Sequence, residues 1–334
     1  MHFLLRKKIK KPKNITDAGF TLTELIIAMV LSALVITPLL GFMVNILNTD
    51  RQEQAKASSE QEIQTALDYI TRDLKQAIYI YDDAGIDAIK AQLPSPTATD
   101  RVPVLVFWKR EFLDNVIPAA DGNLDDTFVY SLVAYYLIKD NSTTWSNAAR
   151  IARWQISDGV KASGFTVVNG GQVANGVDCP GYDDKYVSGY CPSAGYAPFN
   201  LEGAGTLEQK MNDWTRLSSY TANNTTTNVN YSNTPMVLLD YIDQTTTTNG
   251  VPAVITCPTG TSKVTPASFN TIDTGKMTSF YACIDTANTA AQVFLRGNSL
   301  ARVQTNSLDY NSGKKNYFPE ASVRVQGRGF LFTE

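Results

Sequence analysis

Histidine is nearly absent from the sequence, whose 334 residues contain one, His2. Beyond that position the chain cannot form the Ser-His or Cys-His pairs of nucleophilic catalysis, or the usual zinc sites. It also lacks a glycine-rich phosphate loop ending in Lys-Ser/Thr. Acidic pairs such as Asp183-Asp184 are sequence neighbours, and a glycosidase needs its two carboxylates across a cleft. We therefore predict that the chain is not an enzyme and needs no cofactor.

Charged residues are also missing between Leu25 and Thr49. This apolar run is long enough for a membrane-spanning helix, which needs about 20 residues. Glu24 stands at its start, and a charge within a membrane costs about 2.5 kcal/mol or more, so Glu24 needs a functional reason. Before the run, one acidic residue, Asp17, accompanies six basic residues: Arg6, Lys7, Lys8, Lys10, Lys11 and Lys13. Positive residues remain cytoplasmic, so we expect the rest of the chain outside the cytoplasm.

The junction between these segments reads Gly19-Phe20-Thr21-Leu22-Thr23-Glu24. A basic leader, Gly-Phe, Glu at the fifth position and an apolar run together resemble the processing site of type IV prepilins and type II secretion pseudopilins. The resemblance implies a prepilin peptidase that cuts between Gly19 and Phe20 and methylates the new amino group of Phe20. An ordinary signal peptide would be cut after the apolar run instead. Neither that alternative nor a simple uncleaved anchor explains Gly19-Phe20 or Glu24.

The resemblance also implies a fold, a role and partners. The expected fold is α+β: a long N-terminal membrane helix on an antiparallel-sheet head, the pilin lollipop, with a large loop insertion. The implied protein is a minor pilin or pseudopilin, assembled with other pilins on an inner-membrane platform into a type IV pilus or secretion filament. Glu24 would be an assembly contact that pairs with the amino group of Phe20. The alternative is an adhesive or glycan-binding head mounted on a pilin stem.

Finer features indicate which members of this family the chain resembles most. The segment Leu67–Leu74, which contains Arg72-Asp73-Leu74, is similar to the larger minor pilins and J-type minor pseudopilins. A more specific interpretation is a pseudopilin for polysaccharide secretion in filamentous cyanobacteria. Without residues 1–19 the formal net charge changes from −3 to −8, because 23 basic and 31 acidic residues remain. An acidic chain argues against nucleic acid as a partner.

We predict three parts: a leader (1–19), a helix (20–80) and a β-rich head (81–334). Within the helix, residues 20–49 form the membrane or filament core and 50–80 are amphipathic, with Pro38 and Gly41 marking either a tolerated kink or a weak point. Gaps of three and four give the second half one apolar face: Ile63, Ala66, Leu67, Ile70, Leu74, Ala77 and Ile78.

Within the head, β-branched and aromatic residues predict six strands: Val102–Trp108, Phe128–Lys139, Arg150–Ile156, Met236–Tyr241, Ala291–Arg296 and Ser322–Phe332. The second and third of these are expected to form an antiparallel pair joined by a polar loop. Residues 159–234 are rich in Gly, Asn, Tyr, Ser and Thr. Because loops of this length are uncommon in compact domains, we expect an insertion held by a disulfide.

The cysteines are Cys179, Cys191, Cys257 and Cys283. An even number in an exported chain predicts two disulfides, and four cysteines allow three pairings. Pairing of sequence neighbours is favoured because short loops close more easily. A zinc site is a poor alternative without Cys-x-x-Cys.

Two further sets of residues are weaker candidates for binding sites. Asp121, Asn123 and Asp125 occupy the first, third and fifth positions of a calcium loop, but Asp126 replaces the expected Gly and Leu132 replaces the Glu. A polar turn explains them better. Five aromatic residues stand in polar loops: Trp145, Tyr182, Tyr186, Tyr190 and Tyr196. They could bind sugars or partners, although packing inside the loops is the favoured interpretation.

Overall fold

A computed structural model describes residues 19–118, 123–162, 176–222, 224–266, 277–329 and 331. The chain divides into two compact units, Met1–Arg51 and Gln52–Glu334. The fold is α+β, with a long N-terminal apolar helix and an antiparallel-sheet head, as predicted.

The first helix, α1 (Leu22–Leu74), has 53 residues. All side chains from Gly19 to Asp50 are exposed, and the run without charge predicted a helix of this kind. Within the described residues, α1 is the one helix long and apolar enough to cross a membrane. Among the described residues, the apolar side chains of α1 up to Asp50 are exposed, so this part of the helix requires lipid or other protein around it.

Beyond Gln52, α1 belongs to the head and buries one face. The stripe expected from the spacing is confirmed within the helix, where the buried residues are Ala55, Ser59, Ile63, Ala66, Leu67, Ile70, Asp73 and Leu74. The helix ends at Leu74, and the prediction that it continues to residue 80 is wrong. Ala77–Ile80 forms strand β1 instead, fully buried and antiparallel to the next strand, because that strand offers backbone partners to Ala77, Tyr79 and Ile80, with a register shift between Ala77 and Tyr79.

The first sheet has five antiparallel strands in the order β1-β2-β3-β4-β9. Its other strands are β2 (Arg101–Pro118), β3 (Leu124–Ile138), β4 (Ala149–Ser157) and β9 (Met236–Ile242). The predicted antiparallel pair is β3 and β4, with Ala134 opposite Trp154. Between β1 and β2 lies a short helix, α2 (Asp83–Ile89), capped by the Asp82 side chain.

The second sheet has the order β10-β11-β12-β13 and is also antiparallel. Its strands are β10 (Ser262–Val264), β11 (Phe280–Asp285), β12 (Ala290–Arg296) and β13 (Glu320–Gln326). The sequence predicted β12 and β13 from Ser322 to its end at Gln326, but it missed β10 and β11. The prediction that the last strand continues beyond Gln326 is wrong at residues 327–329, which are not in a strand. Four short 3₁₀ helices, at Lys90–Gln92, Thr247–Asn249, Ser299–Arg302 and Ser312–Tyr317, lie in connections among the described residues.

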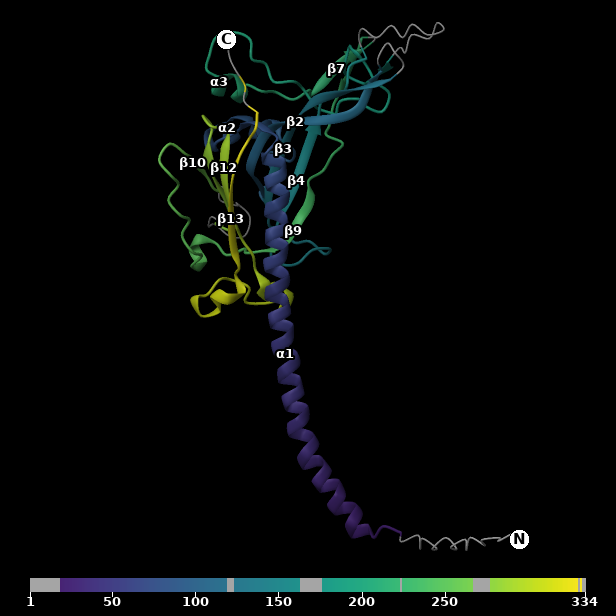
Figure 1. Cartoon of the computed structure of the whole chain (residues 1–334), viewed down its shortest axis with the longest axis vertical. Helices are drawn as coiled ribbons and strands as arrows, with labels where there is room; N and C mark the ends of the chain where they lie inside the picture. Colours follow the sequence, from purple (N-terminus) through teal and green to yellow (C-terminus); the bar gives the residue numbers. More distant parts are fainter. Residues whose placement is uncertain are drawn as a thin grey trace, which may run out of the picture. The chain divides into compact units, whose positions relative to one another are not determined.

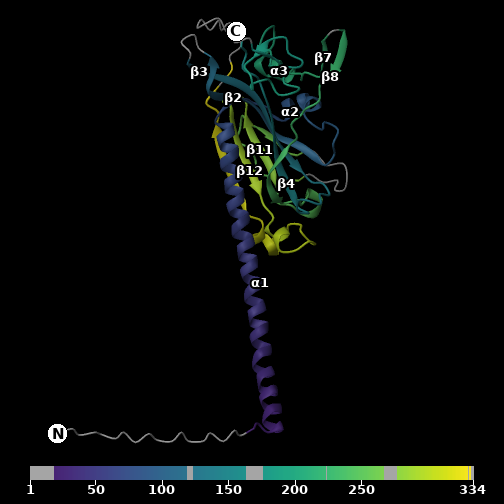
Figure 2. The ribbon, with the colours of Figure 1, turned by 90° about the vertical axis from the view of Figure 1, so that its right-hand side faces the viewer.

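The head end of α1 packs against both sheets. In Figure 1, β12 and β13 lie to one side of the upper part of α1, and β4 and β9 lie to the other. The isolated bridge between Ile242 and Gly297 links the two sheets, and one continuous core joins their side chains to those of α1. Figure 2 shows the head end of α1 lying along the sheets.

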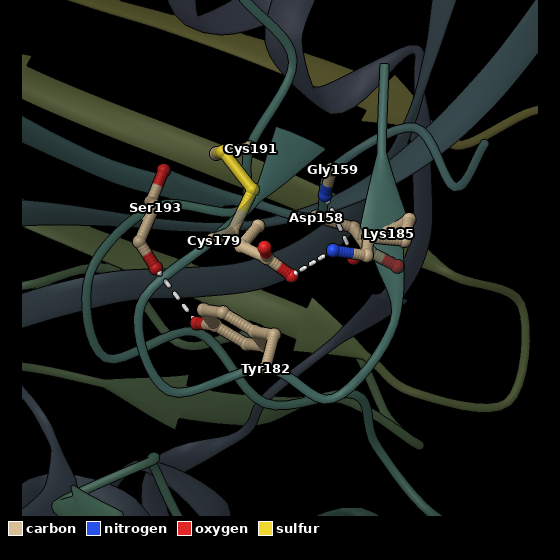
Figure 3. Close-up of a disulfide and its surroundings, with 8 residues drawn as sticks. Asp158, Gly159, Cys179, Tyr182, Lys185, Cys191 and Ser193 are labelled. Atoms are coloured by element: carbon tan, nitrogen blue, oxygen red, sulfur yellow. Dashed lines mark hydrogen bonds and ion pairs between the residues drawn. A yellow bond between two sulfur atoms is a disulfide. The ribbon is translucent and has the colours of Figure 1, made fainter. Parts of the chain in front are cut away.

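The described part of residues 159–234 is a set of short elements. These are β5 (Val177–Asp178), β6 (Lys185–Tyr186), α3 (Leu207–Asn212), β7 (Ser219–Ala222) and β8 (Thr225–Asn228). Cys179 pairs with Cys191 inside this segment, and Cys257 pairs with Cys283 of β11, the neighbour pairing that loop closure favours. Beside the first disulfide, the Tyr182 hydroxyl donates to the Ser193 carbonyl at 3.1 Å (Figure 3).

Candidate functional site

The predicted processing segment immediately precedes α1. Gly19 and Phe20 are exposed and lie outside regular secondary structure, and the backbone at Gly19 has open space around it. The leader residues 1–18 lie outside the described residues. The Gly19–Phe20 bond is therefore sterically open on the side that the structure describes, as a site for a peptidase must be.

Glu24 caps the start of α1. One oxygen of its carboxylate, Oε2, accepts the Thr21 backbone N–H at 3.0 Å and the Thr21 hydroxyl at 2.9 Å. The Glu24 backbone N–H in turn donates to Thr21 Oγ1 at 3.3 Å. This reciprocal arrangement is a capping box, in which Thr and Glu three residues apart satisfy amides left free at a helix start. The capping box was not predicted, although its Thr-x-x-Glu signal is present in Thr21-Leu22-Thr23-Glu24.

The membrane half of α1 remains helical through Pro38 and Gly41. Just before the proline, the Thr37 hydroxyl donates to the Ala33 carbonyl at 2.8 Å. Proline cannot donate an amide to the Leu34 carbonyl four residues earlier, and the Thr37 hydroxyl bond falls on the neighbouring carbonyl of Ala33 instead. A weak point at Pro38 and Gly41 stays a prediction.

The N-terminal segment is similar to a known family. Residues 16–40 match the family model of the prokaryotic N-terminal methylation motif. The methylation motif contains Gly19, Phe20 and Glu24, and with the apolar helix it is consistent with the type IV pilin-like family. A motif of this type implies a membrane-anchored protein, a prepilin peptidase and assembly with other pilins. No curated protein and no solved structure matches the chain.

Beyond the methylation motif, a buried charge cluster joins the last turn of α1 to the first sheet. Asp73 accepts hydrogen bonds from Arg153 Nε at 2.6 Å, Lys109 Nζ at 3.0 Å and the Tyr135 hydroxyl at 2.7 Å. Burial disfavours the charged carboxylate, but the bonds and charges of Arg153 and Lys109 outweigh it, so the pKa of Asp73 lies below its ordinary value. The Arg-Asp-Leu segment is thus an anchor between α1 and the head.

A second contact holds α1 about three to four turns before Asp73. Arg302 donates to the Ser59 hydroxyl at 2.9 Å and forms an ion pair with Glu62. Its guanidinium also lies 4.0 Å from the ring centre of Tyr241 on β9. Together with the Asp73 cluster, this contact fixes the head-side half of α1 at both ends.

The loop aromatics divide into two groups. Tyr186 and Tyr196 are buried, and Tyr182 is half-buried, as the favoured interpretation of packing inside the loops predicts. Burial raises the pKa of Tyr182 and Tyr196. Trp145 and Tyr190 are exposed, so packing inside the loops does not account for them.

The calcium candidate has little support in the described structure. Asp121 lies outside the described residues, whereas Asn123 and Asp125 are exposed at the start of β3. Within the described ranges, no three His, Cys, Asp or Glu side chains are grouped as a metal site. The three-residue calcium set stays a prediction from sequence.

Proposed function

We propose that the chain is a minor pilin or pseudopilin, cut between Gly19 and Phe20, methylated at Phe20 and assembled into a type IV pilus or a type II secretion-like filament. The observation that carries this proposal is the methylation motif placed directly before a helix whose residues are exposed through Asp50. An enzyme or a soluble binding protein has no use for this combination.

The exposed half of α1 suits both environments that such a subunit occupies, the membrane and the filament. Lipid can surround it before assembly, because every internal backbone group of a helix is satisfied. Apolar helices of neighbouring subunits can surround it afterwards. The same surface serves both states, so the head keeps its fold while the helix exchanges lipid for protein.

Glu24 supports the transfer between these states. Before assembly, the capping box supplies its carboxylate with two donors from Thr21. In the filament, the methylated amino group of Phe20, from the same or a neighbouring subunit, would provide a positive partner. A buried charge is tolerated when it is paired, and loss of one partner is costly.

The size of the head favours a minor role. The unit Gln52–Glu334 is large, and such heads would crowd one another if they stood at every position of a dense filament. A subunit at the tip, or one that primes assembly, has room for it. Copy number decides the point, because a chain as abundant as the filament itself would be a major pilin.

The decisive experiment is processing in cells that contain a prepilin peptidase. Intact-mass analysis should show loss of residues 1–19 and one added methyl group on Phe20. Gly19→Leu should leave the full-length chain, whereas Gly41→Leu, the same change beyond the matched motif, should be processed normally. Cleavage at another bond, or processing of Gly19→Leu, would contradict the proposal.

A further inference from the structure

A groove runs along the head between α1, β9 and the loop that precedes β4. Its volume is about 910 Å³, which lies in the range of small-ligand sites, about 300–1,000 Å³. One side is a stripe of α1 residues at helical spacing, including Gln61, Thr65 and Tyr69. Most lining side chains carry hydrogen-bonding groups, so the groove differs from the apolar grooves that accept amphipathic helices.

Three aromatic rings line the groove, each from a different element. Trp145 comes from the loop, Tyr69 from α1 and Tyr241 from β9. Trp145 is 43% exposed and Tyr69 is 39% exposed. The other three tryptophans of the chain, Trp108, Trp154 and Trp214, are buried. An exposed tryptophan beside a groove is the kind of surface that recognises a ligand with its ring.

The Trp145 loop is held in place although its ring faces water. The Ser142 hydroxyl oxygen accepts the backbone N–H of Thr144 at 3.1 Å and of Trp145 at 3.3 Å. On the other side, Ser146 donates its backbone N–H and its hydroxyl to Asp240, at 2.9 and 2.7 Å. These bonds fix the backbone on both sides of the tryptophan, which reduces the ordering cost of binding.

Tyr241 is also set in place by an unusual backbone. Its φ is +58°, in the left-handed region, and the pairing of β4 with β9 shifts register there. Bulges of this kind redirect a side chain, and strained residues cluster at ligand sites. The Arg302 guanidinium covers the ring at 4.0 Å, and the Asn298 amide donates to the Tyr241 carbonyl at 2.7 Å.

We propose that this groove binds a neutral oligosaccharide. Sugar rings present apolar C–H faces and a rim of hydroxyl groups, which match flat aromatic rings beside hydrogen-bonding side chains. The charges at the groove balance, because Glu62 pairs with Arg302, and the lining otherwise holds one anion, Asp240, which accepts two bonds from Ser146, and one cation, Arg72. A neutral ligand therefore fits the groove better than a strongly charged one.

The structure favours a sugar over an added peptide strand. β9 is the last strand of its sheet, and an edge strand can in principle pair with an extended peptide. Two register shifts interrupt its pairing with β4, between Ala149 and Ile151 and between Ile151 and Ala152. Such bulges twist an edge and protect it against strand addition. The proposal is also independent of filament assembly, because all the groove residues belong to the head unit.

The test uses tryptophan emission of the full chain in detergent, since Trp145 is the exposed one of its four tryptophans. The probes are cellotetraose, laminaritetraose, chitotetraose and maltotetraose, with a hyaluronan tetrasaccharide as the charged comparison. At least one neutral probe should shift the emission to the blue and protect Trp145 from acrylamide in a saturable way. Absence of protection by every neutral probe, or protection by the charged probe alone, would overturn the proposal.

Variants separate the groove from the rest of the surface. Tyr69→Ala should weaken the protected complex by about tenfold, whereas Tyr190→Ala, at an equally exposed tyrosine outside the groove (39%), should not change it. Calorimetry should show retained binding for Trp145→Phe and loss for Trp145→Ala, with unchanged near-ultraviolet circular dichroism of the buried aromatics. Equal binding by Tyr69→Ala and the unmodified chain would overturn the site. The site would also be overturned if Trp145→Ala left sugar binding unchanged and only reduced the amount of the chain found in filaments. The groove would then be a contact between subunits.

Discussion

The carboxylate of Asp73, on the last turn of α1, lies 2.6 Å from Arg153 Nε on β4. The two residues are 80 positions apart in the sequence. Lys109 and Tyr135 complete the cluster from β2 and β3. Three neighbouring strands thus contact one carboxylate, and this contact determines where α1 ends on the sheet.

Asp73→Asn should destabilise the head by about 2 kcal/mol at pH 7, because half-buried Arg153 loses its charged partner and buried Lys109 keeps only Glu111. Urea unfolding followed by near-ultraviolet circular dichroism measures the change. Asp68→Asn makes the same substitution at an exposed position of the same helix and should have little effect. Equal stabilities of the two variants would show that the cluster contributes nothing.

The same carboxylate predicts a pH dependence. Its folded-state pKa lies below the ordinary value of 3.8, so the folded chain favours the ionised form more than the unfolded chain does. This contribution is complete above the unfolded pKa and is lost as the pH falls through the folded pKa. The stability difference between the unmodified chain and Asp73→Asn should therefore shrink below about pH 4. A difference that is constant from pH 7 to pH 3 would contradict this assignment.

Gly297→Ala should weaken the packing of α1 on the head. A Cβ at this position would lie 2.6 Å from Cδ1 of the buried Ile63, and overpacking costs about 1–3 kcal/mol. Ile63→Val removes that Cδ1 atom at a cost of about 0.5–1.5 kcal/mol. In the double variant the two losses should be less than additive, as thermal or chemical unfolding can measure. If the two losses were fully additive, Gly297→Ala would act through a contact other than the one with Ile63.

The two disulfides should stabilise the head unequally. They close loops with separations of 26 and 12 residues, for Cys257–Cys283 and Cys179–Cys191 respectively. Chain entropy predicts that each disulfide stabilises the folded head by about 3 kcal/mol, and that the longer loop contributes about 0.7 kcal/mol more than the shorter one. Chemical unfolding of the two double Cys→Ala variants compares them directly. A larger loss for Cys179–Cys191 would point to local structure rather than loop length.

The role of Glu24 in helix capping can be separated from the role of its charge. Glu24→Gln keeps the side chain that a capping box accepts, whereas Glu24→Ala removes it. If the charge pairs with Phe20 during assembly, both variants should be cleaved normally and both should be lost from filaments. Mass analysis and filament fractionation provide the two measurements. Normal incorporation of Glu24→Gln would show that helix capping, and not the charge, is required.

Local sequence determined the features that depend on neighbouring residues. The run without charge from Leu25 to Thr49 predicts a helix by composition alone, and the spacing from Ile63 to Leu74 predicts its buried face. The strands β3, β4 and β9 were likewise visible in their aromatic and β-branched residues. The methylation motif is a contiguous set of residues, so it needs no tertiary information.

The tertiary structure decided whatever depends on distant partners. β1 continues the apolar pattern of α1, and only the backbone of β2 makes it a strand. The partners of Asp73 come from strands 36 to 80 residues away, and local spacing holds no information about such contacts. The groove joins Tyr69, Trp145 and Tyr241, three residues that chain folding alone brings together. The sequence by itself therefore determined how the chain is anchored, and the folded head decided what surface it presents.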